Sequence, residues 1–228
     1  MKIAMFGHKR IPSREGGVEI VVEELASRMV KTGNEVTCFN RNGKGCVSQK
    51  YGKRYNFNGI EVKTVPTIDK KGMAAVTAAF FSSVMAAFGK YDIVHIHAEG
   101  PAFFSWIPKL FHKKIVVTVH GLDWQREKWK GGFGAKFIRK GEENAVKYAD
   151  EIIVLSKNVE QYFKTRYNRI TRFIPNGVNR PTIRKADRIR SVYGLEKNGY
   201  ILFLGRLVPE KGIMYLIEAF SKVNTDLK

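Results

Sequence analysis

Short apolar runs alternate with amphipathic stretches along the first 179 residues of the chain. Seven of these runs predict strands, at residues 2–6, 35–40, 60–65, 92–97, 114–121, 151–155 and 171–174. After the first run, Val18, Val22, Leu25 and Met29 recur at helical spacing, which predicts a helix with one buried face. Strands that alternate with helices predict an α/β domain with an open parallel sheet and right-handed crossovers.

Two further stretches raise questions about the elements between the strands. Residues 42–58 are rich in Gly, Lys and Tyr and predict an exposed loop, in which a hairpin is possible. Residues 72–89 carry no charge and approach the length of a membrane span, but their alanines and serines make them only weakly hydrophobic. Because a strand follows at once, we expect a helix buried against the sheet. An aromatic helix is predicted at 101–111.

The hydrophobic pattern changes after residue 179 and predicts a second, smaller unit. Residues 180–199 are polar and basic and read as an interdomain connection. In residues 200–228 an apolar strand precedes one helix whose apolar side chains are Ile213, Leu216, Ile217, Phe220 and Val223. One strand and one helix cannot bury a core, so we expect an incomplete domain with a poorly covered apolar helix face.

Composition points to anionic partners. Forty Lys and Arg against 21 Asp and Glu give a net charge of +19, and the excess is regional, with eight basic and two acidic side chains in 41–71 and eleven and three in 157–197. No zinc-finger or RNA-binding motif accompanies it, so an anionic membrane surface fits better than nucleic acid. Two cysteines and no signal peptide favour the cytoplasm, at the inner face of the membrane.

Residues 200–212 carry the clearest candidate chemistry. The apolar strand reaches Gly205, and Arg206 and Lys211 follow before the start of a helix. Two cations beside a helix N-terminus suit a diphosphate, although a solvated basic loop is the alternative. Gly16 and Gly17, where the first helix begins, would let backbone N–H groups approach a phosphate, or form a plain turn.

Two predicted strands end in histidine. His97 and His120 lie at carboxyl ends of strands, where ligands of such sheets bind, and Asp123 follows closely. His95, in mid-strand, is expected to be buried, and a buried structural role is open for His97 as well. No histidine or carboxylate cluster has metal-ligand spacing, so we expect neither a metal nor another cofactor.

Two tryptophans stand in the basic stretch that follows. Trp124 and Trp129, interleaved with Arg and Lys, could stack on a sugar or lie at a membrane boundary. An amphipathic surface helix with its preceding loop is the alternative. Further along, Pro175, Asn176 and Gly177 predict a turn.

These motifs together resemble a family, the glycosyltransferases of family 4 with the two-domain GT-B fold. The matching segments, in the order in which the family has them, are Gly16-Gly17, Asp92-Ile-Val-His-Ile-His97, Thr118-Val-His-Gly121, Ala149-Asp-Glu-Ile-Ile-Val-Leu-Ser156, Ile174-Pro-Asn-Gly-Val178 and Gly205-Arg-Leu-Val-Pro-Glu-Lys-Gly212. The opening His8-Lys-Arg-Ile-Pro12 and the segment Gly121-Leu-Asp-Trp-Gln-Arg126 are similar to the rhamnosyltransferase-like members of polysaccharide biosynthesis.

The resemblance implies a complete Rossmann-like N-terminal domain and the first β-α unit of a second one. It also implies retaining, metal-independent transfer of a sugar from a nucleotide diphosphate sugar to a glycan or lipid-linked acceptor. Arg206 and Lys211 would hold the diphosphate, with the backbone of Gly16 and Gly17 facing it, and His120 would contact the sugar. The remaining cleft and acceptor residues would be His97, Asp123, Asn176, Gly177, Trp124 and Trp129.

One departure from the family stands out. The two glutamates that in the family contact the donor sugar and ribose have no counterpart, because Glu210 and Glu218 share their spacing but lie in the wrong elements. We therefore expect a C-terminally truncated, inactive piece of a transferase. A non-catalytic module that docks an acidic lipid or a partner is the alternative, and a sugar-nucleotide epimerase would need carboxylates beside His97 and His120.

Overall fold

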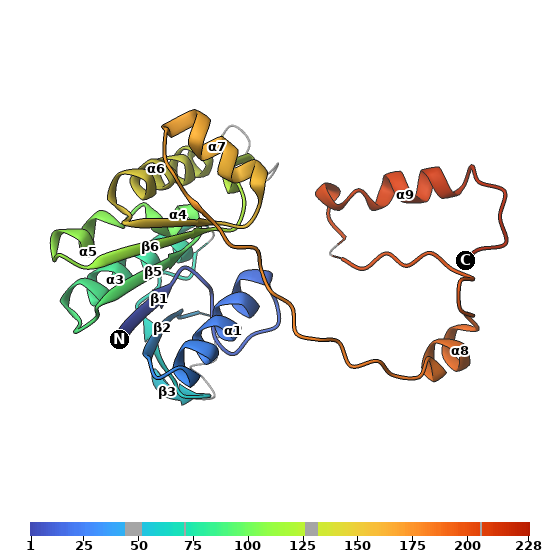
Figure 1. Cartoon of the computed structure of the whole chain (residues 1–228), viewed down its shortest axis with the longest axis horizontal. Helices are drawn as coiled ribbons and strands as arrows, with labels where there is room; N and C mark the ends of the chain where they lie inside the picture. Colours follow the sequence, from blue (N-terminus) through green and yellow to red (C-terminus); the bar gives the residue numbers. More distant parts are fainter. Residues whose placement is uncertain (44–51, 71, 126–131, 206) are drawn as a thin grey trace. The chain divides into compact units, whose positions relative to one another are not determined.

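A computed structural model describes residues 1–43, 52–70, 72–125, 132–205 and 207–228 (Figure 1). Its centre is an eight-stranded sheet in the order β3-β4-β2-β1-β5-β6-β7-β8. The strands are β1 (Lys2–Phe6), β2 (Glu35–Arg41), β3 (Arg54–Phe57), β4 (Ile60–Val65), β5 (Ile93–His97), β6 (Lys114–Val119), β7 (Glu151–Val154) and β8 (Arg172–Phe173). All neighbours pair in parallel except β3, which forms an antiparallel hairpin with β4 at one edge.

Helices cover both faces of this sheet. The helices are α1 (Gly17–Lys31), α3 (Met73–Phe88), α4 (Glu99–Ala102), α5 (Trp106–Leu110), α6 (Phe133–Tyr148) and α7 (Lys157–Tyr167), with the 3-10 helix η1 (Asp123–Gln125) after β6. Alternate residues of β1 separate the two cores: Ile3 and Met5 pack with α1, whereas Ala4 and Phe6 pack on the side of α3, α6 and α7. The predicted α/β sheet with parallel pairing is thus confirmed, with the hairpin added.

The uncharged stretch forms the core helix α3, as its small side chains predict. Ala78, Ala79, Ser82 and Ala86 are buried along it. No helix in the described part of the chain is long and apolar enough to cross a membrane. The prediction of a core helix is confirmed. Small side chains let α3 approach the sheet closely, although they make the helix only weakly hydrophobic.

Two local expectations are wrong. The single helix predicted at 101–111 is split into α4 and α5, because residues 103–105 bond three positions back and Pro108 has no N–H to continue the ladder. The turn predicted at Pro175-Asn176-Gly177 does not form either. Ile174 N–H continues the β8 ladder onto Val154, and the chain runs on without a turn.

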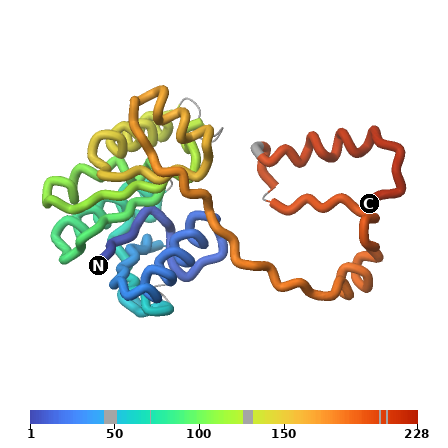
Figure 2. The backbone as a smooth tube through the Cα atoms, viewed as in Figure 1, coloured from blue at the N-terminus to red at the C-terminus, as the bar shows by residue number. Residues whose placement is uncertain are grey.

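The chain divides into two compact units, Met1–Asn176 and Gly177–Lys228. In the second, an extended segment leads to α8 (Asp187–Tyr193), η3 (Pro209–Lys211) and α9 (Ile213–Phe220) (Figure 2). The strand predicted at 201–204 is not formed. A strand needs a neighbouring strand, and within the described residues the one backbone hydrogen bond of this segment runs from Ile201 N–H to Lys228. Ile217 and Val223 of the predicted face are exposed and none of its residues is fully buried, in line with the expected poor cover.

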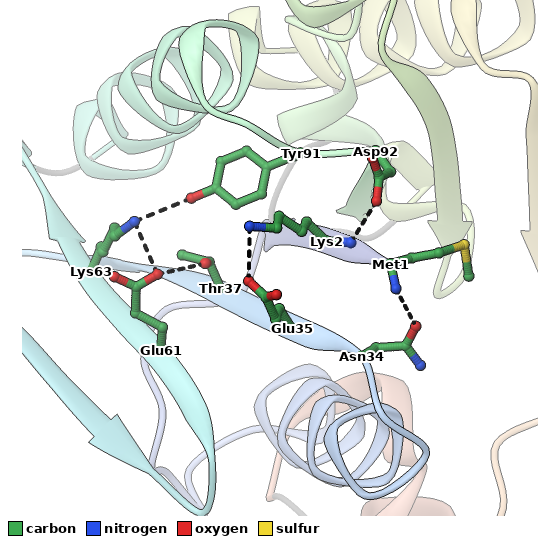
Figure 3. A network of polar contacts seen from close by, with 9 residues as sticks. All are labelled: Met1, Lys2, Asn34, Glu35, Thr37, Glu61, Lys63, Tyr91 and Asp92. Carbon is green, nitrogen blue, oxygen red and sulfur yellow. Dashed lines mark hydrogen bonds and ion pairs between the residues drawn. The ribbon is translucent and has the colours of Figure 1, made fainter.

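The amino-terminal edge of the sheet carries a network of polar contacts (Figure 3). Lys2 pairs with Glu35 at 3.2 Å across β1 and β2, and Lys63 pairs with Glu61 at 3.0 Å within β4. The carboxylate of Asp92 accepts the Lys2 backbone N–H at 2.7 Å. Because the cations and carboxylates of this edge bond to one another, the network stabilises the sheet. The candidate site lies at the opposite edge, where the parallel strands have their carboxyl ends.

Candidate active site

The carboxyl ends of β1, β5 and β6 converge, and the close approach depends on one glycine. Gly7 follows β1 with φ +112°, and a Cβ built on it would lie 2.0 Å from the carbonyl oxygen of His97. Only glycine tolerates both the conformation and the contact. The loop after β1 therefore passes directly over the end of β5, which places His8 close to the histidines of β5 and β6.

Three histidines, two in β5 and one directly after β6, lie next to one another at this edge with tilted rings. The rings of His95 and His97 lie 4.3 Å apart and those of His97 and His120 lie 5.5 Å apart. His97 Nδ1 and His120 Nε2 share a hydrogen bond of 3.2 Å, and His95 Nε2 lies 2.8 Å from the Thr118 hydroxyl. The structure thus brings together the two strand-end histidines that the sequence singled out, and buries His95 as expected.

Burial holds the rings of His95 and His97 neutral. It lowers the pKa of His95 to about 4 and that of His97 well below 6.5, and the charges of neighbouring histidines lower both further. His97 Nε2 is buried without a partner in the described residues. A bare acceptor costs less there than an unpaired N–H, so we assign the proton of His97 to Nδ1, which donates to His120 Nε2. His120 then carries its own proton on Nδ1, as a hydrogen-bond donor.

Sequence reasoning missed the part played by His8. Its Nε2 bonds to Asn40 Oδ1 at 3.0 Å, and the same oxygen accepts the Ile11 N–H at 3.0 Å. Burial lowers the pKa of His8 to about 4. Asn40 thereby ties the loop after β1 to the end of β2. The available signal was the position of His8 just beyond an apolar run, since His97 and His120 also stand at the ends of their strands.

A small cavity opens beside His8. Gly7, Phe39, Arg41 and the small residues Ala75, Ala78, Ala79 and Ser82 of α3 line it, together with Pro101. Burial lowers the pKa of Arg41, and its guanidinium makes no hydrogen bond or ion pair with the residues that the structure describes. The cavity therefore offers a cation to a polar or anionic group at the carboxyl edge.

A buried carboxyl pair fixes the turn that follows His120. Glu99 of α4 and Glu142 of α6 are fully buried, and Glu99 Oε2 accepts the backbone N–H of Asp123 at 2.9 Å. Burial and a hydrogen bond with Glu142 raise the pKa of Glu99 to about 9. Glu99 is thus protonated at neutral pH, beside Glu142.

Glu142 accepts three hydrogen bonds from donors in two elements, η1 and α7. Its Oε2 accepts the indole N–H of Trp124 at 3.0 Å, and its Oε1 accepts the hydroxyl groups of Tyr162 and Tyr167. The guanidinium of Arg139 lies 5.4 Å from the Trp124 ring centre. Trp124, predicted to face an acceptor, therefore has its polar end anchored inside the protein. No local pattern indicates this role for Glu142, because only packing brings η1 and α7 around it.

Gly16 and Gly17 stand at the start of α1, as predicted, but they differ in surroundings. A Cβ at Gly16 would lie 2.0 Å from the carboxylate of Glu19, which also accepts the Lys9 N–H, whereas a Cβ at Gly17 would meet nothing within 4 Å. The carboxylate of Glu19 already occupies part of this helix N-terminus. Open backbone is therefore found at Gly17.

The other predicted residues lie in the linker, in the second unit or outside the described residues. Asn176 is exposed at the end of the first unit, and Gly177 begins the second. Lys211 is an exposed residue at the end of η3, and Gly212 follows with φ +68° before α9. Arg206 and Trp129 lie outside the described residues.

The fold is that of GT-B glycosyltransferases. Sucrose-phosphate synthase from Thermosynechococcus elongatus superposes with a TM-score of 0.77 at 18% identity, over 97% of this chain and 60% of that one. Anabaena HepE, solved in complex with UDP and glucose, gives a TM-score of 0.69 at 18% identity, over 100% of this chain and 60% of that one.

Sequence comparison identifies the family. Residues 15–180 match Glycosyltransferase Family 4, and the chain belongs to that family. An uncharacterized glycosyltransferase of Methanocaldococcus jannaschii is 26% identical over 98% of this chain. The chain spans 60% of the length of that relative.

Proposed function

We propose that the first unit, Met1–Asn176, is the acceptor-side part of an enzyme that transfers a sugar from a nucleotide diphosphate sugar to an acceptor hydroxyl. The observation that carries the proposal is the hydrogen-bonded pair of His97 and His120 at the carboxyl edge of a family 4 chain. A neutral, buried partner orients His120 so that its Nδ1–H can donate to a sugar oxygen.

The donor diphosphate would be held by basic side chains and by backbone at a helix start. Arg206 and Lys211 would neutralise the charge that develops on the leaving diphosphate, which supports a metal-independent reaction. The open backbone at Gly17, with Gly16 beside it, would face the same phosphates, since helix N-termini favour anions. Asp123, Asn176 and Gly177 would border the sugar.

The acceptor would come from cell-surface polysaccharide or lipid-linked oligosaccharide synthesis, through hexosyl or rhamnosyl transfer. The cation of Arg41 in the cavity beside His8 suits a polar or anionic acceptor group. Trp124 and Trp129 would flank the acceptor. A net charge of +19 supports work at an anionic membrane, on its cytoplasmic side.

The test is calorimetric titration of UDP, GDP and dTDP into this chain and into a version extended to the length of its relatives. We expect one nucleotide to bind the extended version, and His120→Ala to weaken binding of the matching nucleotide sugar more than binding of the nucleotide alone. His112→Ala, at an exposed histidine, is the control. Binding of no nucleotide by either protein would contradict the proposal.

A further inference from the structure

An apolar face runs along the outer side of α3 and continues onto α5. On α3 the exposed side chains are Met73, Phe80 and Phe88, which recur on one side of the helix. Trp106, Leu110 and Phe111 extend the face at α5. We call these six residues the α3–α5 face. Phe88 and Leu110 are the most exposed of them, at 72% and 67%.

Aromatic contacts make this face continuous. The ring centres of Phe88 and Phe111 lie 4.6 Å apart, and those of Phe80 and the half-buried Phe104 lie 5.6 Å apart. Lys113 donates to the carbonyl groups of Gly89 and Tyr91 at 2.7 and 3.1 Å and so ties the end of α3 to the start of β6. An exposed, connected aromatic surface of this kind is typical of an interaction site.

The charges around the face are almost all positive. Residues 70–114 contain six lysines and two carboxylates, and one of the carboxylates is Glu99, buried and protonated. The other, Asp92, accepts the Lys2 backbone N–H. Lys70 and Lys90 are exposed and make no side-chain hydrogen bond or ion pair with the residues described. Asp150, near α5, is paired with Lys109 at 2.8 Å.

We propose that the α3–α5 face docks on an anionic lipid bilayer. This inference rests on the proposed function and adds the surface of the protein that would contact the membrane. Phenylalanine and tryptophan side chains enter the boundary between headgroups and acyl chains, while lysines beside them bind anionic headgroups. A second copy of the chain fits less well, because a symmetric contact would bring the same lysines together.

The sheet topology gives this docking a geometric consequence. Because α3 returns from the end of β4 to the start of β5, its face runs from the carboxyl edge of the sheet to the amino edge. With this face on the membrane, the strands of the first unit would run roughly parallel to the lipid surface. The carboxyl edge with His97 and His120 would then open along that surface. A lipid-linked acceptor would reach that edge without leaving the bilayer.

The test is flotation of the 228-residue chain with phosphatidylcholine vesicles that contain roughly one-third phosphatidylglycerol. We expect the chain to float with these vesicles and to stay behind with pure phosphatidylcholine. Phe88→Ser combined with Leu110→Ser should lower partition by about tenfold or more. Phe133→Ser combined with Ile170→Ser, at apolar residues elsewhere that are still more exposed, should leave partition unchanged.

Three outcomes would overturn the proposal. The first is a wild-type chain that does not float with the anionic vesicles. The second is a Phe88 and Leu110 variant that floats like the wild type. The third is a Phe133 and Ile170 control whose partition falls as much as that of the Phe88 and Leu110 variant. Sedimentation velocity adds a fourth, a dimer that the Phe88 and Leu110 variant dissociates, which would assign the face to a second copy. Because nucleotide titration does not use this face, failure of docking and failure of the transferase proposal are distinguishable.

Discussion

The indole N–H of Trp124 donates to Oε2 of Glu142 at 3.0 Å, in a part of the protein where Glu142 is completely buried. This bond fixes the turn after His120 from the side of α6. Its energetic weight comes from the burial of Glu142, because three part-buried donors bond to this one buried carboxylate.

Glu142→Gln should destabilise the first unit by about 2 kcal/mol, since the carboxamide has one acceptor oxygen for three donors. Urea unfolding measures this loss, and NMR of the Trp124 indole proton follows the bond itself. Tyr162→Phe, which removes a single donor, should cost less. An indole signal that does not move in the Glu142 variant would show that the bond is unimportant.

Glu99→Gln should stabilise the chain, and more so as pH rises. The raised pKa of Glu99 means that the folded state keeps a proton that the unfolded state releases above about pH 4.5, so wild-type stability falls as pH rises toward about 9. The carboxamide imitates the protonated acid and lacks this loss. Between pH 6 and 8 the free-energy difference between variant and wild type should grow by about 1 kcal/mol per pH unit.

Glu143→Gln, at an exposed residue paired with Lys140, is the matched control for Glu99. Its difference from wild type should not change with pH over the same range. A Glu99 variant that behaves like this control would show that Glu99 is ionised in the wild type and would contradict its protonated state.

His95→Gln should reduce the acid sensitivity of the fold. Burial lowers the pKa of His95 to about 4, so between about pH 6.5 and 4 the unfolded state binds a proton that the folded state does not, and stability falls as pH falls. Removing the imidazole should shrink the loss between pH 7 and 4.5 by about 2 kcal/mol. The same loss in variant and wild type would argue against a neutral His95, and His112→Gln, at the surface, serves as control.

Gly7→Ala should destabilise the first unit by about 3 kcal/mol, because its Cβ would overlap the His97 carbonyl and its φ of +112° strains any other residue. Gly17→Ala should change stability by less than about 1 kcal/mol, in the stabilising direction, since it adds a methyl group in open space at a helix start. Thermal unfolding of the two variants compares them directly. Equal effects would contradict the close approach.

Lys211→Ala should weaken binding of the nucleotide diphosphate to the extended protein by about tenfold, equivalent to about 1.4 kcal/mol, because a cation is removed from the phosphates. Arg206→Ala should do the same. Lys222→Ala, on the same unit but paired with Glu218 at 2.9 Å, should leave affinity unchanged. Calorimetry that finds all three variants equal to wild type would remove the diphosphate assignment.

The sequence by itself determined the architecture of the first unit. Its apolar runs and helical periodicities predicted seven of the eight strands and their parallel pairing, because parallel strands are buried on both faces and leave an unmistakable pattern. The same pattern placed His97 and His120 at strand ends, and the parallel direction of β5 and β6 made them neighbours. The predicted domain limits and the roles at Arg206 and Lys211 stay predictions.

Only the tertiary structure decided how the site is supported. Glu99, Glu142 and Trp124 are far apart in the chain, and no periodicity shows that their polar atoms meet in a buried cluster. The failed strand at 201–204 has a related cause, since an apolar run becomes a strand only where another strand pairs with it. Local pattern specifies which side chains avoid water, whereas packing between distant elements decides which polar groups meet there.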